Sequence, residues 1–539
     1  MGKKIGIDLG TTYSCVSYVD DIGVIKIVNN IDDQATTPSI VYFDPDGTAT
    51  VGEMARQAGG LNPDLIVERV KNYMGDPNYK FFANGKEYSA AAVSNLILRQ
   101  LVADAERLIG EEIEGAVITC PAYFGEEARN ATKFAGENVV LSNGNNLKVL
   151  KILDEPTAAA IAYGNSRQED MDKTVLIYDL GGGTFDCTVM KLSFHGKERK
   201  MEVITTGGNH KLGGKDWDEA LTELVRQKFI EKHPVDKEEM KNDVELNAYF
   251  NEQVENLKKR LSSRNSDGIT VRYEFHKEHI EVTREEFEEA TSNLLNETIS
   301  LVNDMLEKKN LNMMKDIDEI ILVGGSTYMP QVRDRLAAEY NKVISQYEPN
   351  KAVAMGAALV ARDCAENPGA LSDSENASSI SIVDPQTEVT TFIVEKCTKS
   401  YGVRLVHGGE YKVLNLVFKD TPKPAEGHSV DNASNLTITN TSDLVSEVGI
   451  LVLENESFEE WVEMGDCNEI YVEEPIHFDG EVPGSNTVSI DLFVDANGIV
   501  SLRLTDTVTG KSYNMTPKRK SDDANKTGMD DVICMTLKQ

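Results

Sequence analysis

The sequence lacks any run of apolar residues long enough to cross a bilayer, and no apolar leader follows Lys3 and Lys4 near its start. A membrane-spanning helix needs about 20 consecutive apolar residues, and a secretory leader needs an apolar core after a basic start. We therefore expect a cytoplasmic protein with no membrane partner.

Positive charge is scarce as well. The chain carries 55 lysines and arginines against 89 aspartates and glutamates, which gives a formal net charge of −34. Proteins that bind nucleic acid need clustered cations to neutralise phosphates. This balance therefore excludes a general nucleic-acid binder.

Cysteine and histidine form no pattern that would hold a metal ion or a disulfide framework. The seven cysteines are scattered and odd in number, none belongs to a Cys-x-x-Cys pair, and the eight histidines show no ligand spacing. Isolated cysteines of this kind are typical of small buried side chains in a reducing compartment.

What the chain does contain is a glycine-rich turn flanked by two carboxylates. Residues Asp179–Asp186 read Asp-Leu-Gly-Gly-Gly-Thr-Phe-Asp and follow an apolar run, Thr174–Tyr178, which we predict to be a buried strand. Backbone N–H groups in such a turn can approach a phosphate, and a cation offsets the repulsion between phosphate and carboxylates. The pattern indicates a Mg²⁺-nucleotide site, although an ordinary glycine turn would look the same.

Related patterns occur twice more in the chain. Lys4–Ser14 contains Asp-Leu-Gly-Thr-Thr after an apolar strand, and Asp318–Pro330 contains Gly-Gly-Ser-Thr after another. Two copies of the strand and its Asp-Leu-Gly turn in one chain predict two similar lobes that face a shared cleft.

With these motifs in view, the chain resembles a known family. Ile7–Ser14, Asp154–Gly164, Asp179–Asp186 and Leu322–Thr327 are similar in sequence, order and spacing to the signatures of the seventy-kilodalton heat-shock (DnaK-type) chaperones. The resemblance extends from residue 3 to about residue 365 and is weaker beyond that point.

The resemblance implies an architecture. It predicts an α/β ATPase domain over residues 1–365, with two lobes of the actin-like, ribonuclease-H-like duplicated fold, and an interdomain linker over residues 366–385. An all-β sandwich that binds substrate is expected over residues 386–516. A short C-terminal tail, residues 517–539, stands where the family has a helical lid, so release of a bound peptide should be fast.

The resemblance also assigns roles at a site for ATP or ADP with Mg²⁺. Metal-bound waters are assigned to Asp8 and Asp179, and catalysis to Lys71, Glu155, Asp179, Thr184 and Asp186. Nucleotide contacts are assigned to Gly10, Thr11, Thr12, Tyr13, Gly181, Gly182, Gly183, Gly214, Glu255, Lys258, Lys259, Ser262, Gly324, Gly325, Ser326 and Tyr328. Without the resemblance, Lys71 would be interpreted as a surface charge, and Glu155 as an acid that is favourable at a helix start. The face from Glu255 to Ser262 would pass for an exposed side of a helix.

Several positions depart from the family pattern. Lys215 replaces an acid, Tyr328 replaces the arginine that stacks on the base, and Asn350 replaces an aspartate. Tyrosine can stack too, but without the cation the affinity for nucleotide should fall. The nearest match to the family's linker, Ser379–Asp384, has Ser381 inside its apolar run, which puts the coupling between domains in question.

The C-terminal part has the alternation of β-strands. Val488–Leu504 alternates apolar and polar residues on both sides of Asn497-Gly498, which predicts a β-hairpin. By spacing, the family's peptide-binding pocket falls on Val403, Ile438, Val448 and Ile450. Each of these side chains would equally fit the core of a sandwich.

Three functions remain open on these grounds. The first is an ATP-dependent molecular chaperone that binds extended apolar segments of unfolded clients, assisted by a J-domain co-chaperone and a nucleotide-exchange factor. The second is a slowly hydrolysing co-chaperone or scaffold of the same family. The third is a small-molecule kinase, because sugar and acetate kinases share the two-lobed phosphate architecture, but such a kinase would not explain the matches at Glu155–Gly164 and 488–511.

Overall fold

The fold begins with the strand that precedes the first glycine turn. In the computed structural model, β1 (Lys3–Asp8) and β2 (Tyr13–Val19) form an antiparallel hairpin around that turn, with Ile5, Ile7 and Val16 buried. The structure describes residues 2–59, 62–167, 169–366, 380–383, 389–428, 447–470, 474–477, 488–506, 510, 512–515 and 519–538.

β1 is the central strand of a mixed sheet. The strand order is β11-β10-β1-β2-β3, and β4 pairs with β2 as well. The other strands are β3 (Ile25–Val28), β4 (Thr37–Pro38), β10 (Ile113–Cys120) and β11 (Lys148–Asp154). Two helices, α2 (Ala90–Ile109) and α3 (Glu126–Glu137), share an apolar core with this first sheet.

A second sheet repeats the arrangement of the first. Its order is β18-β17-β12-β13-β14-β20-β19. Its strands are β12 (Met171–Leu180), β13 (Phe185–His195), β14 (Glu198–Asn209), β17 (Glu319–Val323), β18 (Val343–Gln346), β19 (Ile380–Val383) and β20 (Thr390–Val394). β12 pairs parallel with β17 and antiparallel with β13, as β1 pairs with β10 and β2. The repeated motif in the sequence therefore corresponds to a repeated strand order.

Two alanine-rich helices, α4 (Glu155–Asn165) and α12 (Ala352–Glu366), lie between the two sheets. They share an apolar cluster with β10 of the first sheet and β12 of the second. Glycine allows them to approach closely, because a Cβ atom on Gly356 would lie 1.8 Å from the carbonyl oxygen of Ala158. This packing holds the glycine turns of the two sheets in a fixed relation.

Smaller elements surround the two sheets. Next to the first sheet lie β5 (Ile40–Phe43), β6 (Ala49–Val51), α1 (Glu53–Gly59), η1 (Pro63–Leu65), β7 (Ile66–Glu68), η2 (Val70–Tyr73), β8 (Phe81–Ala83) and β9 (Lys86–Tyr88). Next to the second lie α5 (Gly214–Lys232), α6 (Lys237–Asn242), α7 (Val244–Leu261), β15 (Ser266–Tyr273), β16 (His276–Thr283), α8 (Arg284–Ala290), α9 (Ser292–Lys308), α10 (Met313–Asp316), η3 (Gly325–Tyr328) and α11 (Pro330–Tyr340).

Two antiparallel sheets form the C-terminal part. One has the order β26-β22-β21-β25-β27 and the other β23-β29-β30-β31. The elements are β21 (Ser400–His407), β22 (Glu410–Val417), β23 (Ala425–His428), β25 (Val452–Asn455), β26 (Trp461–Glu463), η4 (Met464–Asp466), β27 (Asn468–Glu469), β29 (Val488–Val494), β30 (Val500–Asp506) and β31 (Ser512–Met515), beside a separate pair of β24 (Glu447–Ile450) and β28 (Glu474–His477). Side chains of both sheets join in one apolar cluster, as in a β-sandwich. The predicted hairpin is confirmed by the pairing of β29 with β30.

The stretch expected to link the two parts contains a strand of the second sheet. Within residues 366–385 the structure describes the end of α12 and β19. β19 pairs antiparallel with β20, and β20 pairs parallel with β14. β20 therefore extends the second sheet, although its residues fall within the stretch that the sequence assigned to the sandwich.

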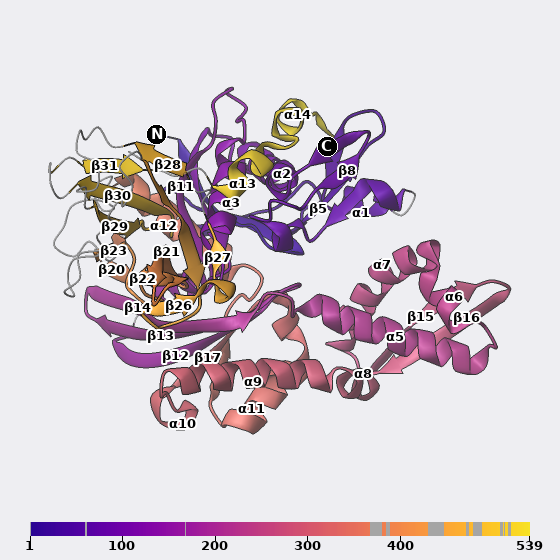
Figure 1. The fold of residues 1–539 in the computed structure, drawn as a ribbon. Helices are drawn as coiled ribbons and strands as arrows, with labels where there is room; N and C mark the ends of the chain where they lie inside the picture. Colours follow the sequence, from indigo (N-terminus) through magenta and orange to yellow (C-terminus); the bar gives the residue numbers. More distant parts are fainter. Residues whose placement is uncertain are drawn as a thin grey trace.

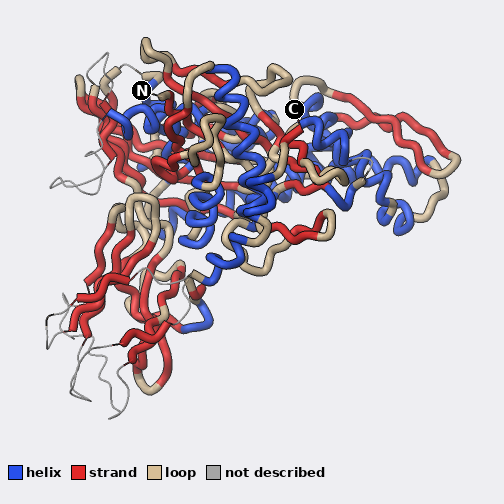
Figure 2. The backbone as a smooth tube through the Cα atoms, turned by 90° about the horizontal axis from the view of Figure 1, so that it is seen from above, coloured by secondary structure: helices blue, strands red, loops and turns tan. Residues whose placement is uncertain are grey.

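The stretch expected to be a short tail is folded. It contains α13 (Lys520–Lys526), α14 (Met529–Cys534) and β32 (Leu537–Lys538), and β32 pairs parallel with β6. Both views place the marked ends of the chain on the same side of the molecule (Figure 1 and Figure 2). Within the described residues, no helix combines the length and apolarity needed to cross a membrane.

Candidate functional site

The three glycine turns meet at one cleft of about 1020 Å³. Most residues that the sequence assigned to nucleotide, metal or catalysis line it: Asp8, Gly10, Thr11, Thr12, Tyr13, Lys71, Glu155, Asp179, Gly181, Gly182, Thr184, Gly214, Glu255, Lys258, Lys259, Ser262, Gly324, Gly325, Ser326 and Tyr328. Gly183 and Asp186 are not part of the lining. A Cβ atom on Gly183 would lie 2.7 Å from Thr11, and Asp186 is buried at the start of β13.

The first two turns face each other at short range. A Cβ atom on Gly182 would lie 2.0 Å from Thr12 Oγ1, so any side chain there would displace the opposite turn. Gly324 in the third turn has a φ of +84°, a left-handed conformation that favours glycine, and its Cβ would lie 2.5 Å from Asp179 Oδ1. Glycine at these positions brings three strand ends around one volume.

Hydrogen bonds hold the second turn in place. The Gly181 N–H donates to the Thr184 carbonyl at 2.9 Å within the turn. The Gly181 carbonyl accepts from the Gly214 N–H and from the Ser326 hydroxyl, both at 2.9 Å. Lys258 of α7 donates to the Gly214 carbonyl, also at 2.9 Å. The second turn, the start of α5 and the third turn are therefore one hydrogen-bonded unit.

Three buried acids (Glu155, Asp179 and Asp186), the half-buried Asp8 and the buried Lys71 lie at the base of the cleft. Burial and the charge of Glu155 raise the pKa of Asp8 to about 7. For the same reasons the pKa values of Asp179 and Asp186 rise well above their ordinary range. Lys71 forms an ion pair with Glu155, and although burial lowers the pKa of Lys71, the charges of Glu155 and Asp8 raise it more. The cluster has an excess of acids that a bound cation would neutralise.

These residues fit a nucleotide that carries a divalent cation. Thr12 Oγ1 is buried and has no hydrogen-bond partner among the described residues, so a polar ligand atom would satisfy it. Within the described ranges, no three acidic, histidine or cysteine side chains form a ready-made metal cage. Mg²⁺ is usually held by one or two carboxylates together with waters and substrate phosphates, which suits a metal that enters with its nucleotide.

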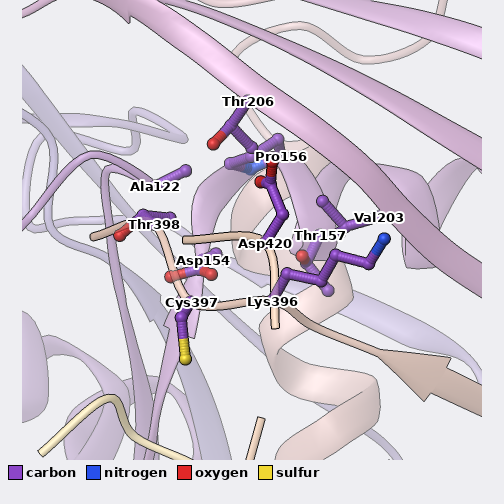
Figure 3. A pocket seen from close by; sticks show the side chains of 10 residues that line it. All are labelled: Ala122, Asp154, Pro156, Thr157, Val203, Thr206, Lys396, Cys397, Thr398 and Asp420. Atoms are coloured by element: carbon purple, nitrogen blue, oxygen red, sulfur yellow. The ribbon is translucent and has the colours of Figure 1, made fainter. Parts of the chain in front are cut away.

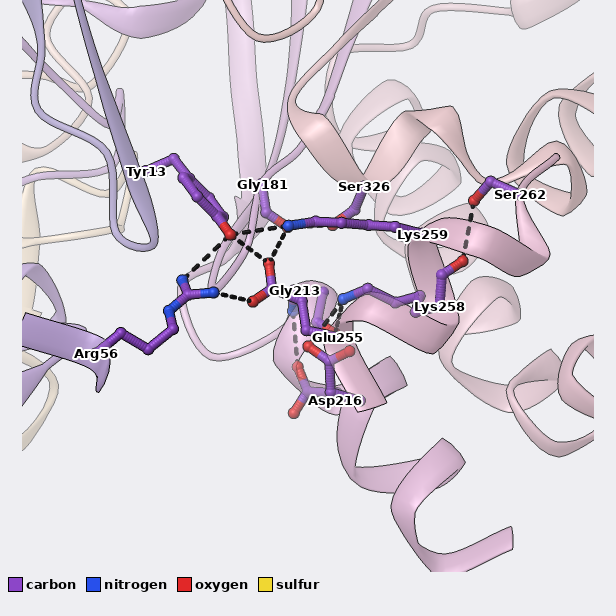
Figure 4. Close-up of polar contacts among 12 residues, drawn as sticks. Tyr13, Arg56, Gly181, Gly213, Asp216, Glu255, Lys258, Lys259, Ser262 and Ser326 are labelled. Carbon is purple, nitrogen blue, oxygen red and sulfur yellow. Dashed lines mark hydrogen bonds and ion pairs between the residues drawn. The ribbon is translucent and has the colours of Figure 1, made fainter. Parts of the chain in front are cut away.

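A polar network spans the cleft beside the first turn (Figure 4). The Tyr13 hydroxyl donates to Glu255 at 2.9 Å and accepts from Arg56 at 3.1 Å. Lys259 also donates to this hydroxyl, at 2.8 Å, and Arg56 lies 3.2 Å from Glu255. Although burial raises the pKa of Glu255, the charges of Lys259 and Arg56 lower it more. The network links α1 directly to α7 across the cleft.

Arg56 is the main residue of this site that the sequence did not predict. It lies on α1, outside the three glycine turns, and only the folded chain brings it opposite Glu255. Lys215 and Asn350, which the sequence marked only as departures from a family pattern, also line the cleft. Tyr328 is about half exposed at 48 %, so its ring is accessible for stacking.

A family model described as Hsp70 protein matches residues 4–384. The chain belongs to the Hsp70 family. Members of this family are chaperones that bind and hydrolyse ATP, so this chain is a chaperone of the Hsp70 type, and the resemblance seen in the motifs is confirmed. The cleft accounts for that family property in physical terms, because its turns and acids suit a phosphate with a cation.

In this Hsp70 chain the sandwich packs on the first sheet through buried ion pairs. Asp154, at the end of β11, lies 2.6 Å from Arg129 of α3 and 3.2 Å from Lys423 of the sandwich. Although burial raises the pKa of Asp154, these two cations lower it more. Lys151 of β11 lies 3.0 Å from Glu395, the residue that follows β20. Removing one partner of such a buried pair typically destabilises a protein by about 3–5 kcal/mol, because the other charge is left buried and uncompensated.

A small pocket at the same junction shows which segments of the Hsp70 chain meet there (Figure 3). Asp154 comes from the end of β11 and Pro156 and Thr157 from the start of α4, whereas Lys396–Thr398 and Asp420 come from the segment after β20 and from the sandwich. Side chains nearly fill this pocket. It is therefore a packed seam between the β11–α4 junction and the sandwich.

Three of the four residues predicted to bind peptide in this Hsp70 chain lie in the part that the structure describes. Val403 on β21 is only 1 % exposed and belongs to the apolar cluster of the sandwich. Val448 and Ile450 lie on β24, which pairs with β28, and Ile438 lies outside the described residues. Val403 therefore contributes to the core, and the four positions stay a prediction for the peptide pocket.

Proposed function

We propose that this chain is an ATP-dependent molecular chaperone that binds extended apolar segments of unfolded clients and couples their release to ATP binding and hydrolysis. The observation that carries the proposal is the convergence of the glycine turns, Lys71 and the buried acids on one cleft of about 1020 Å³. The matching strand orders of the two sheets support two actin-like lobes around the nucleotide. The plan of ATPase domain (1–365), linker (366–385), sandwich (386–516) and tail (517–539) belongs to the same proposal.

In this proposal the turns Gly10–Tyr13 and Gly181–Thr184 bind the phosphates through their backbone N–H groups. A bound Mg²⁺ would neutralise phosphate charge, and Asp8 and Asp179 would hold its water ligands. The side chains of Glu255, Lys258, Lys259, Ser262 and Tyr328 would then hold the nucleoside.

The hydrolysis step would depend on Lys71 and its neighbours. The Lys71 ammonium stabilises the charge that develops on the transferred phosphoryl group, and Glu155 holds that ammonium in place. Thr184 contacts the phosphoryl group, and Asp186 or Glu155 orients the attacking water. The raised pKa values of Asp8 and Asp186 indicate that their charged forms are unfavourable in the cleft. A bound cation would stabilise those charged forms.

The junction offers a route from this chemistry to the sandwich. Asp154, which Lys423 of the sandwich contacts, directly precedes Glu155 in the chain. Lys151 on the same strand holds Glu395 beside β20. We infer that a shift of the sandwich reaches Glu155 through β11, and that client binding changes turnover by this path.

The decisive experiment is steady-state ATP turnover by the purified protein, with and without an extended apolar peptide, for wild type, Lys71→Ala and the exposed control Lys148→Ala. We expect Lys71→Ala to lower kcat by about 100-fold or more, because it removes the charge that stabilises the transition state, while nucleotide affinity changes little. The control should match wild type. Unchanged turnover in Lys71→Ala would refute the proposed chemistry.

The second candidate is a slowly hydrolysing nucleotide-binding scaffold. The observation that favours it is the set of buried ion pairs that joins the sandwich to the first sheet. If these pairs prevented any shift of the docked sandwich, the chain would bind nucleotide without cycling. The same assay separates the two functions, because peptide-stimulated turnover supports the chaperone cycle, whereas turnover that ignores peptide supports the scaffold.

A further inference from the structure

The segment Arg519–Lys538 follows the sandwich in sequence but packs on the helices of the first sheet. Met529 and Val532 of α14 are 3 % and 0 % exposed and belong to the same apolar core as α2. Figure 1 shows α13 and α14, in yellow, beside α2 and α3, in purple. The segment therefore completes a core to which strands near the start of the chain also belong.

Polar contacts from α2 fix this segment at its middle. Arg99 donates to the carbonyl oxygens of Val532 and Met535, the latter at 2.9 Å. Ser89, the N-cap residue of α2, donates two hydrogen bonds to the segment: its N–H to the Thr527 carbonyl at 3.0 Å and its hydroxyl to the Asn525 carbonyl at 2.9 Å. Arg99 and Ser89 of α2 thus provide hydrogen-bond donors for backbone carbonyls of the segment.

The C-terminal end of the segment adds a short strand beside β6. Leu537 and Lys538 pair parallel with β6, and the Ala49 N–H donates to the Thr536 carbonyl at 3.0 Å. Lys538 lies 2.7 Å from Asp44. Backbone pairing and charge therefore add to the apolar burial of α14.

The N-terminal end of the segment lies close to the sandwich at the start of α3. Arg519 forms an ion pair with Glu126, at 2.5 Å, and the Glu126 N–H donates to Glu454 of the sandwich at 3.2 Å. Asn130 of α3 donates to Asp522 at 3.3 Å. The first turn of α3 thus contacts the segment and the sandwich at once.

We propose that Arg519–Lys538 is an intramolecular clamp that keeps the sandwich docked on the first sheet, and β20 paired with β14, whether or not nucleotide is bound. The clamp binds α2, α3 and β6, whose residues do not line the nucleotide cleft. Nucleotide therefore does not compete with it. Docking of the sandwich keeps Lys423 on Asp154 and Glu395 on Lys151, and these pairs hold the end of β20 in place.

Hydrogen exchange on the full-length protein tests the clamp, with and without ATP and Mg²⁺. Two peptides are followed, one over residues 529–535 of the clamp and one over residues 390–394 of β20. Val532→Asp changes a residue of the clamp itself and destabilises it, because it places a charge in an apolar core. Arg99→Ala changes α2 and removes the donor to the clamp's carbonyl oxygens. Arg107→Ala is the matched control on the same helix, where it bonds to Asp104 and Asn29.

In wild type and Arg107→Ala we expect both peptides to exchange slowly with and without nucleotide. In Val532→Asp and Arg99→Ala we expect exchange at 529–535 to rise by at least tenfold, and exchange at 390–394 to rise with it when nucleotide is absent. A released clamp with unchanged β20 would overturn the proposal, as would wild-type β20 that becomes unprotected without nucleotide. Slow exchange at 529–535 in both variants would show that the contacts of Val532 and Arg99 do not hold the segment, and would also overturn it.

The readout does not depend on catalysis. A protein that fails to hydrolyse ATP can still show a clamped sandwich, and a protein with normal turnover can show a released one. Failure of the clamp is therefore distinguishable from failure of the proposed ATPase function.

Discussion

At Gly182 the space for a side chain is already occupied by the facing turn. A Cβ atom there would lie 2.0 Å from the oxygen and 2.6 Å from the Cβ of Thr12, well inside van der Waals contact. The two turns must stay this close if both are to contact one chain of phosphates. The identity of a single residue therefore sets the width of the cleft.

We predict that Gly182→Ala weakens ATP binding by at least about tenfold, because the methyl group forces the two turns apart and displaces phosphate-binding N–H groups. Isothermal titration calorimetry on the purified protein measures the change in Kd. Gly465→Ala is the control, since a Cβ atom on Gly465 meets no atom within 4 Å. Equal affinity in both variants would contradict the proposed role of the turns.

Residues inside the glycine turns could be placed from the sequence, because a strand followed by glycines fixes where the backbone goes. Thr12, Gly181 and Ser326 all line the cleft. Arg56 could not be placed in this way. Its contact with Glu255 joins residues 199 positions apart and depends on how α1 and α7 come together in space.

The link between α1 and α7 carries a prediction at the scale of elements. The Tyr13 hydroxyl, Arg56 and Glu255 join these helices from opposite sides of the cleft, so they must separate before a bound nucleotide can leave. We predict that Arg56→Ala speeds nucleotide dissociation by about tenfold, which matches the loss of roughly 1.4 kcal/mol of contact. Stopped-flow displacement of a fluorescent ATP analogue measures the rate.

The control for this prediction is Arg335→Ala, which removes a partly buried arginine that pairs with Glu339 on its own helix, away from the cleft. Its dissociation rate should equal that of wild type. If Arg56→Ala also releases nucleotide at the wild-type rate, the network of Figure 4 does not gate the cleft.

Whole elements were predicted well where periodicity is long and poorly where it is short. The hairpin at Val488–Leu504 has enough alternation to be recognised, and the structure pairs it as expected. The plan implied by the resemblance begins the sandwich at residue 386, whereas β20 (Thr390–Val394) pairs with β14 in the second sheet. A local pattern does not show a pairing between strands so far apart in sequence. α14 has six residues, and a helix of that length shows no readable period.

At the scale of the whole molecule, negative charge is both abundant and locally buried. Glu126 is fully buried where α3, the clamp and the sandwich meet. Burial raises the pKa of Glu126 to about 7 against the lowering effect of Arg519, while Glu454 and Asp522 add to the rise. The folded protein therefore holds a proton over a pH range in which the unfolded chain has released it.

The sign of the pH dependence follows from this shift. The pKa of Glu126 rises from 4.5 in the unfolded chain to about 7 in the folded protein, so its contribution to stability is greatest below about pH 4.5 and falls as the pH rises to 7. We predict that the free energy of unfolding of wild type, relative to Glu126→Gln, falls by up to about 3 kcal/mol across that range and then levels off. Urea unfolding at a series of pH values measures it, and a constant difference between the two proteins would contradict the prediction.

The pairing of β32 with β6 has a consequence for how this protein is made. Lys538 contacts Asp44, 494 positions earlier in the sequence, and Val532 lies in the same core as β1 and α2. The ribosome synthesises the N-terminal strands long before it synthesises the residues that complete their core. The part of the protein synthesised first therefore reaches its final packing last, and contacts of such high sequence separation fold slowly. During synthesis this chaperone would itself present unfinished apolar surface and be a client for others.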